Sequence, residues 1–182
     1  LNRGQRLNLL GRTTLFPLGR ERCRNSEGTM EYTILHPSEV YGDGSFATFA
    51  GVQNGQKITC MAGTRDQLVA MPMRVAKYIT RESSLMLSEV VGAFAIYCGG
   101  CMLAVEDQMD TACTRLTEAL ANRPFMGVHT FGEHGSLADK ATYHGNLMCS
   151  VIVFSSRRVT PKAVDLATGT TFTVDDPQWD LV

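Results

Sequence analysis

Two cysteines separated by two glycines are the residues in this chain best suited to chemistry. Cys98 and Cys101 stand in the stretch YCGGCML. A Cys-x-x-Cys pair can cycle between thiols and a disulfide, or it can supply half of a zinc site, which usually takes four ligands. It can also be a tight turn whose cysteines pack as small apolar groups. We favour a turn that belongs to the core or lines a ligand pocket, and we keep the metal and redox interpretations as alternatives.

A second unusual stretch, HTFGEHG, begins at His129 and places Glu133 directly after Gly132. Glycine allows close approach of the backbone and a positive φ angle. A carboxylate in this position can therefore face a small recess and bind a cationic group, such as the ammonium of an amino acid. The alternative is a solvated loop carboxylate. We predict that Glu133 lies in a pocket close to the cysteine turn.

His144 and Asn146 stand just before the last strongly apolar run of the sequence. One amide group both donates and accepts hydrogen bonds, so Asn146 can orient a polar ligand or order the loop that carries Glu133. The sequence has no nucleophilic triad pattern, no GxGxxG, no phosphate-binding loop and no HExxH.

A metal site is the first alternative, and its candidate ligands are Cys98, Cys101, His129 and His134. No spacing among them demands a metal, since a structural zinc site commonly uses two paired motifs. A thiol redox protein acting through Cys98 and Cys101 is the second alternative. Redox motifs of this kind open a helix after a strand, in a fold that the rest of this chain does not otherwise suggest.

Composition narrows the classes of protein. The chain has 182 residues, a formal net charge of −1 and a pI of about 6.5, which argues against nucleic acid or anionic membranes as partners. It has no run of about 20 apolar residues that would span a bilayer. Its 6 cysteines fall largely in apolar patterns and accompany 9 methionines, which predicts a reduced, cytoplasmic protein.

Periodicity predicts strands and helices in mixed order. Helical spacing covers 66–81, with Pro72 favouring a start nearer Ala70, and the cleanest helical pattern covers 107–122. A continuous apolar run before the Gly pair predicts a fully buried central strand. The other expected segments are strands at 30–36, 45–52, 57–63 and 146–154, with 45–52 and 57–63 paired as a hairpin, extended chain from 125, and a loop at 133–142. This order predicts an α+β fold, with a largely antiparallel β-sheet and two main helices packed on one face.

The ends of the chain are predicted to lie outside the main domain. Residues 1–28 are rich in arginine and glycine, and we expect a linker or the end of an upstream module that docks through its apolar side chains, Leu9, Leu10, Leu15 and Phe16. The main domain is predicted to cover 29–156. Residues 157–182 form a C-terminal extension with one possible strand at GTTFTV. Because the chain begins with Leu1, we expect it to be part of a longer protein.

The order of these motifs resembles the C-terminal half of the FIST family (F-box and intracellular signal transduction proteins). The resemblance covers roughly residues 9 to 156. It is carried by FPLG, the DGS turn, CGGC, FMGVHTFGEHG and HGNLMCSVIVF, and most specifically by the Gly-Glu step and HGNLM. Many family members have arginine at the position of Cys101, and others carry a second cysteine as this chain does.

The resemblance implies a cytoplasmic, non-catalytic sensory domain for small ligands, of the kind found in bacterial and some eukaryotic proteins. Amino acids are the proposed ligands, and haem, as in nitric-oxide sensors, is the alternative cofactor. The partners implied are an N-terminal FIST half and a signalling output domain, such as a histidine kinase or a cyclic-dinucleotide enzyme. By matching motifs, the resemblance assigns ligand contacts to seven residues: Cys98, Gly99, Gly100, Gly132, Glu133, His144 and Asn146.

Overall fold

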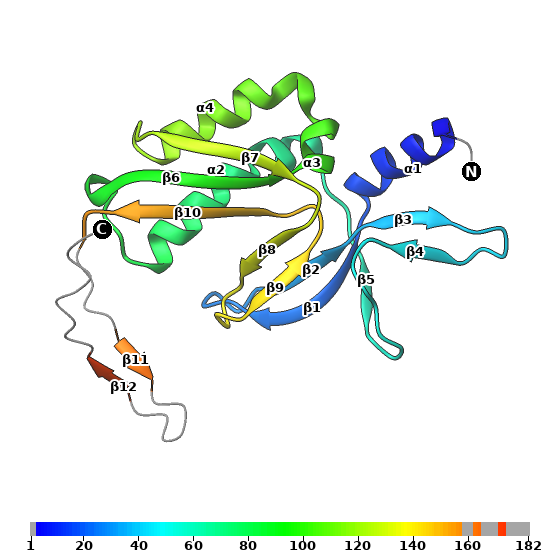
Figure 1. Ribbon diagram of the computed structural model, residues 1–182, viewed down its shortest axis with the longest axis horizontal. Helices are drawn as coiled ribbons and strands as arrows, with labels where there is room; N and C mark the ends of the chain where they lie inside the picture. Colours follow the sequence, from blue (N-terminus) through cyan, green and yellow to red (C-terminus); the bar gives the residue numbers. More distant parts are fainter. Residues whose placement is uncertain (1–2, 158–161, 165–170, 174–182) are drawn as a thin grey trace.

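The computed structural model describes residues 3–157, 162–164 and 171–173 (Figure 1). The helices are α1 (Arg3–Leu15), α2 (Arg65–Glu82), α3 (Gly99–Ala104) and α4 (Met109–Ala119), with the short 3-10 helices η1 (Leu87–Glu89) and η2 (Glu106–Gln108). The strands are β1 (Leu18–Arg24), β2 (Met30–Leu35), β3 (Pro37–Val40), β4 (Phe46–Thr48), β5 (Ile58–Cys60), β6 (Val90–Cys98), β7 (Phe125–Thr130), β8 (Glu133–Ser136), β9 (Thr142–Gly145), β10 (Cys149–Ser155), β11 (Lys162–Val164) and β12 (Thr171–Thr173). The predicted α+β class is confirmed.

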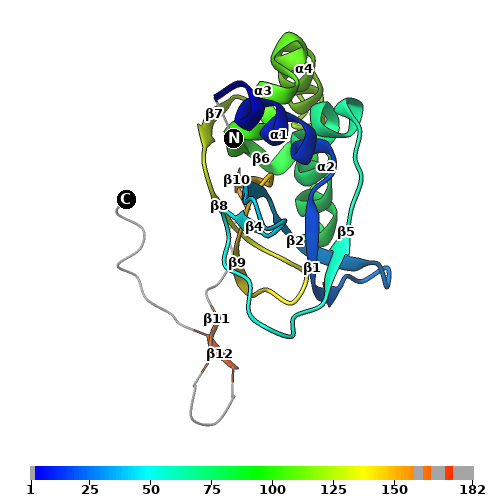
Figure 2. The ribbon, with the colours of Figure 1, turned by 90° about the vertical axis from the view of Figure 1, so that its right-hand side faces the viewer.

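The buried strand β6 is the middle strand of the sheet β10-β6-β7. Strand β10 is antiparallel to it, whereas β7 is parallel to it. Helices α2 and α4 pack together on one face of this sheet (Figures 1 and 2). The largest core cluster joins Val69 of α2, Leu116 of α4 and Ala95 of β6. The apolar run therefore forms the predicted central strand. It is not fully buried, because Val91 is exposed and Phe94 and Ile96, which share a face, are half-buried.

A second sheet, β2-β1-β5, is antiparallel throughout. Its middle strand, β1, falls within the segment 1–28, which was expected to be a linker or the end of an upstream module. The linker alternative was wrong about local structure, because this segment holds α1 and β1. The sequence of β1, LGRERCR, gives no sign of a strand. Most of its residues are only half-buried, and its charged side chains leave no alternating apolar face. The boundaries of the main domain stay predictions.

The predicted hairpin between 45–52 and 57–63 was wrong. Strand β4 pairs with β3 across the YGDGS turn, and β5 pairs with β1. Asp43 stabilises that turn, because its Oδ1 accepts hydrogen bonds from the Ser45 N–H (2.9 Å) and the Ser45 hydroxyl (2.6 Å). Gly44 adopts φ of 86° there. The YGDGS turn therefore joins β4 to the preceding strand, β3. The sequence of β3, PSEV, is only weakly apolar and did not indicate a strand.

Two further segments differ from the predictions. The pair Gly99 and Gly100 opens the short helix α3 instead of making a reverse turn. The segment expected to be a loop at 133–142 contains β8 and part of β9, which pair antiparallel from Glu133–Gly145 to Ser136–Thr142. These strands are polar, so no apolar alternation marked them. Part of the predicted strand GTTFTV is present as β12, and most of the rest of 157–182 lies outside the described residues.

Helix α2 begins at Arg65, earlier than the start near Ala70 that Pro72 favoured. Its N-cap is a reciprocal capping box. The Thr64 side chain accepts from the Gln67 N–H at 3.2 Å, and the Gln67 side chain accepts from the Thr64 N–H at 2.8 Å. The predicted helix is confirmed, with Pro72 inside it.

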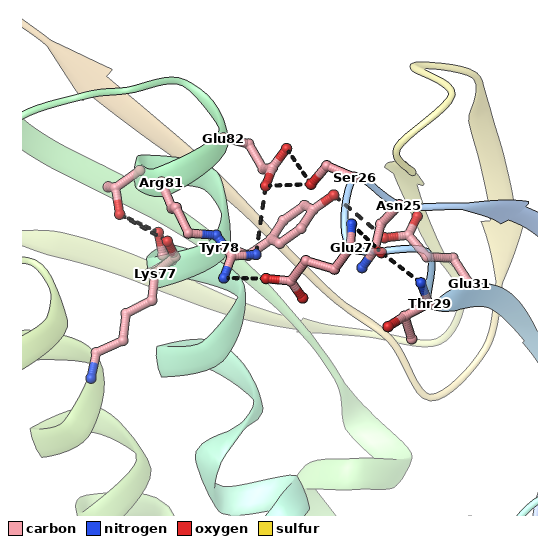
Figure 3. A network of polar contacts seen from close by, with 11 residues as sticks. Asn25, Ser26, Glu27, Thr29, Glu31, Lys77, Tyr78, Arg81 and Glu82 are labelled. Atoms are coloured by element: carbon pink, nitrogen blue, oxygen red, sulfur yellow. Dashed lines mark hydrogen bonds and ion pairs between the residues drawn. The ribbon is translucent and has the colours of Figure 1, made fainter.

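A polar network ties the β1–β2 turn to the C-terminal end of α2 (Figure 3). Arg81 forms an ion pair with Glu27 at 2.9 Å, and the Ser26 hydroxyl donates to Glu82 at 3.2 Å. On the adjacent strand β2, Glu31 accepts from the Tyr78 hydroxyl at 3.4 Å and from the Ala138 N–H at 2.8 Å. Glu31 thus connects the second sheet to α2 and to the β8–β9 turn.

We expect Thr64→Ala to lower the free energy of unfolding by about 1 kcal/mol, because it removes the side-chain acceptor of the capping box. Urea titration followed by circular dichroism measures the change. Thr114→Ala is the control, since the Thr114 hydroxyl bonds only within α4, to the Asp110 carbonyl, and its loss should leave stability almost unchanged. Equal effects in the two variants would contradict a capping role for Thr64.

Candidate functional site

A cavity of about 370 Å³ lies where α1, α3 and the β7–β8 turn meet. In both views of the ribbon α1 runs beside α3 (Figures 1 and 2). Apolar side chains supply much of the wall: Leu10, Phe49, Leu103, Ala104 and Phe131. The polar lining residues are Thr14, His36, Cys98 and Asn146, and three glycines complete the wall: Gly11, Gly100 and Gly132. The walls therefore come from segments far apart in the sequence.

His36 holds α1 beside the cavity through polar contacts. Its Nε2 lies 2.9 Å from Thr13 Oγ1 and 3.3 Å from the Leu10 carbonyl oxygen, and its ring packs against Phe49 at 5.5 Å between centroids. Burial lowers the pKa of His36 below its usual value, and the hydrogen bond to the Leu10 carbonyl opposes this only in part. The imidazole is therefore neutral at neutral pH, which suits an apolar wall.

Asn146 carries the second polar anchor of the cavity. Its Oδ1 accepts from the His36 N–H at 3.4 Å, and its own N–H donates to the Ile34 carbonyl at 3.1 Å. Only 6% of Asn146 is exposed, so its amide is held in the buried part of the cavity wall. These bonds join the end of β9 to the end of β2.

Two of the glycines allow the close approach that the cavity requires. A Cβ added at Gly100 would stand 3.3 Å from Leu147 Cδ2 and 3.9 Å from His36 Cε1. Gly132 has φ of 126°, a conformation that other residues rarely adopt, and a Cβ there would stand 3.0 Å from His144 Nε2. The glycines thus permit α3 and the β7–β8 turn to border the same space.

The cysteine pair forms part of the cavity floor. Cys98 ends β6, serves as the N-cap residue of α3 and lines the cavity, whereas Cys101 is fully buried behind it. The pKa of the Cys98 thiol is lowered to about 7, chiefly because the Cys101 thiol donates a hydrogen bond to it, with help from the N–H groups of Cys101 and Gly100. The same contact, together with burial, raises the pKa of Cys101. Near neutral pH the Cys98 thiol can therefore ionise, whereas the Cys101 thiol stays protonated.

Glu133 lies beneath the β7–β8 turn, with 1% of its surface exposed. Its Oε1 accepts from the Thr130 hydroxyl at 2.9 Å and the Gly132 N–H at 3.1 Å, and its Oε2 accepts from the Met148 N–H at 3.4 Å. It does not line the cavity. The carboxylate therefore orders the chain at Gly132 and contributes to the site through that chain.

Four of the seven predicted contact residues line the cavity: Cys98, Gly100, Gly132 and Asn146. The others lie around it. Gly99 is buried against the Phe131 ring, to which an added Cβ would approach within 3.3 Å. His144 is exposed on β9 and stacks on His134 of β8, with ring centroids 5.0 Å apart.

The candidate metal ligands are dispersed. His129 is exposed on β7 and packs edge-on against Tyr97, and His134 points from β8 to His144. Cys98 and Cys101 contact each other. Within residues 3–157 and the two short C-terminal strands, no group of three or more histidine, cysteine, aspartate or glutamate side chains is arranged to hold a metal ion.

Sequence reasoning missed the five of the twelve lining residues that α1 and the segments next to β2, β3 and β4 provide. Leu10 and Thr14 stand four residues apart, which places them on one face of a helix, and this spacing was the available signal. Nothing local marked His36 or Phe49, because their role depends on the pairing of β3 with β4.

No described helix is long and apolar enough to cross a membrane.

The site and the fold define an α+β domain with a small, largely apolar pocket where α1, α3 and the β7–β8 turn meet. The family model of the FIST C domain matches residues 3–136, and the chain belongs to this family. FIST C domains are sensor-type domains of signal-transduction proteins. The match includes α1 and β1, which supply part of the cavity wall. No curated protein and no solved structure matches the chain.

We expect Glu133→Ala to lower the free energy of unfolding by about 3 kcal/mol, because it leaves three partly buried donors without their acceptor. Chemical denaturation measures the loss. The neighbouring exposed residue provides the control, and His134→Ala should change stability by no more than about 0.5 kcal/mol. A stable Glu133→Ala protein would show that the carboxylate does not hold the turn.

Alkylation of Cys98 should depend on pH with a midpoint near 7, since only the thiolate reacts. Between pH 6 and pH 8 we expect the rate with iodoacetamide to rise by roughly tenfold and then level off. Two groups face this thiol, with opposite effects on its pKa: the Cys101 thiol lowers it and Glu133 raises it. Peptide mapping by mass spectrometry assigns the modified residue. A rate that keeps rising well above pH 8 would contradict the low pKa.

Proposed function

We propose that this domain senses a small, mostly apolar molecule with one hydrogen-bonding end, which it binds without catalysing a reaction. The observation that carries the proposal is the pocket of about 370 Å³, which opens to solvent beside Phe131 and Leu103 and whose size falls in the range of small-molecule sites. Its family, a sensor-type domain of signal-transduction proteins, agrees with this role. The location that we propose is the cytoplasm.

The nature of the lining supports this class of ligand. Leu10, Leu103 and Phe131 offer apolar contacts, which favour a hydrocarbon or aromatic body. Asn146 and Thr14 offer amide and hydroxyl groups suited to one polar end. His36 is neutral at neutral pH and adds no charge. A neutral alcohol, amide or heteroaromatic ring fits this lining better than a molecule with two charges.

Free amino acids are the alternative ligands. Their ammonium group was expected to bind Glu133, but the contacts of that carboxylate are with Thr130, Gly132 and Met148. An amino acid would then have to bury its charges without the expected partner, which costs several kcal/mol.

Haem is the alternative cofactor. The lining histidine, His36, directs Nε2 to Thr13 and to the Leu10 carbonyl, which leaves haem with weaker support than a small organic ligand.

A sensor must bind its ligand more tightly in one conformation than in another. Helix α1 is the wall best suited to respond, because it borders the cavity through Leu10 and Thr14 and contacts only α3 and β3 extensively. The output partner that we propose is a signalling domain such as a histidine kinase or a cyclic-dinucleotide enzyme, reached together with an N-terminal FIST half.

We expect Gly11→Phe to abolish ligand binding. Gly11 lines the cavity, and an added Cβ would meet no atom within 4 Å, so the new ring can fill the space without a clash. Saturation-transfer NMR with benzyl alcohol, indole, leucine and phenylalanine measures binding. The two neutral fragments should bind to the original protein more tightly than the amino acids. In Gly11→Phe their signals should fall by at least about tenfold, the effect of losing most of the apolar contact area.

Gly42→Phe is the matched control, because Gly42 also has open space around it but lies outside the cavity. Its binding signals should equal those of the original protein, and denaturation should show that both variants are folded. Fragments that bind equally well to Gly11→Phe would refute the cavity as the site. Tighter binding of amino acids would support the alternative ligand class, and a Soret band in the purified protein would support haem.

A further inference from the structure

The cysteine pair has the geometry of a dithiol that can close to a disulfide. Cys98 is the N-cap of α3 and Cys101 is its third residue, so both thiols lie on the first turn of one helix. The two side chains are in hydrogen-bonding contact. Both cysteines are free. Only glycines separate them, so no side chain between them has to move when the backbone adjusts to the shorter distance of a covalent bond.

The two cysteines differ in access. Cys98 lines the cavity, whereas Cys101 has no exposed surface. A small reagent that enters the cavity therefore meets the sulfur of Cys98 first. Cys101 contacts Cys98 but does not line the cavity, so it can attack only a bond already formed at Cys98. This order of access divides the pair into an attacking thiol and a resolving thiol.

We propose that Cys98 and Cys101 form a reversible disulfide by exchange with small disulfides that enter the cavity, with Cys98 attacking and Cys101 resolving. Neither the family assignment nor the proposed ligand requires this reaction. The site would add a redox input to the same cavity. Because Cys98 is part of the cavity wall, the oxidation state of the pair and the occupancy of the cavity would influence each other.

The reaction balances with a small organic disulfide as the oxidant. The Cys98 thiolate attacks one sulfur of the reagent, a new S–S bond forms, and the other half leaves as a thiolate. Cys101 then loses its proton to that thiolate and attacks the Cys98 sulfur, which releases the second half as a thiolate that takes a proton from water. Two protein thiols are oxidised and one reagent disulfide is reduced to two thiols. A dithiol reductant reverses the sequence.

The lowered pKa of Cys98 and the raised pKa of Cys101 agree with this division of roles. An attacking thiol works best when its pKa is close to the ambient pH. The protonated Cys101 thiol supports the Cys98 thiolate until the mixed disulfide forms. At that point the sulfur of Cys98 no longer carries charge, so the contact that raised the pKa of Cys101 weakens and Cys101 becomes easier to deprotonate.

The test uses the reduced 182-residue chain and bis(2-hydroxyethyl) disulfide, a small neutral reagent. After the remaining thiols are blocked with N-ethylmaleimide, peptide mapping should find a Cys98–Cys101 disulfide, and dithiothreitol should restore both thiols. Cys101→Ser should accumulate the mixed disulfide on Cys98. In Cys98→Ser, modification of Cys101 should be slower by roughly a hundredfold than modification of Cys98 in Cys101→Ser.

Gly11→Phe tests the route through the cavity, and the exposed thiol of Cys60 in the same molecule serves as an internal reference. Filling the cavity should slow exchange at Cys98 by about tenfold or more relative to Cys60. The proposal is overturned if folded, reduced protein forms no Cys98–Cys101 disulfide, or if Cys101 reacts equally fast without Cys98. Failure of fragment binding with intact exchange would refute only the ligand proposal. The central result, the Cys98–Cys101 disulfide, is measured in the original protein and does not depend on the folding of a variant.

Discussion

The burial of strand β6 is the constraint on which the rest of this domain depends. Its apolar residues are covered by α2 and α4, with β10 and β7 along its two edges. The strand ends at Cys98, where α3 begins, and this fixes the cavity floor relative to the core. The second sheet and α1 then complete the walls through a few polar anchors, of which His36 and Asn146 are the main ones. A floor fixed to the core and a wall held by a few polar contacts suit the sensing function that we propose.

The sequence predicted those features that have a strong local cause. The buried strand and the helices around Ala76 and Leu116 follow from hydrophobic burial with a regular period, and the structure confirms them. Strand β1 and the β8–β9 hairpin were missed because their residues are polar or half-buried and their pairing depends on distant partners. The start of α2 was misjudged because the capping box at Thr64 outweighs the cost of Pro72 within the helix. Local chemistry therefore predicted the core better than the periphery.

The same distinction applies to the site. Motifs located four residues of the cavity, because glycine-rich turns beside buried strands are local features of the sequence. They could not show that Glu133 turns inward to bind backbone N–H groups, since that depends on where Met148 lies after folding. They also could not show that α1 closes the cavity, because its contacts with His36 exist only in the folded chain. The cysteine motif predicted a turn, and the structure instead made Cys98 the N-cap of a short helix, which brought the two thiols together.

Helix α1 has 13 residues and is therefore about 20 Å long, and it touches the cavity near its C-terminal end, at Leu10 and Thr14. A rigid rod held near one end acts as a lever. The free arm from Arg3 to Leu10 is about 10 Å long, so a tilt of about 5° at the held end would displace the far end by about 1 Å. The consequence is that any adjustment of the cavity wall at Leu10 is passed along the helix to the start of α1, well away from the cavity.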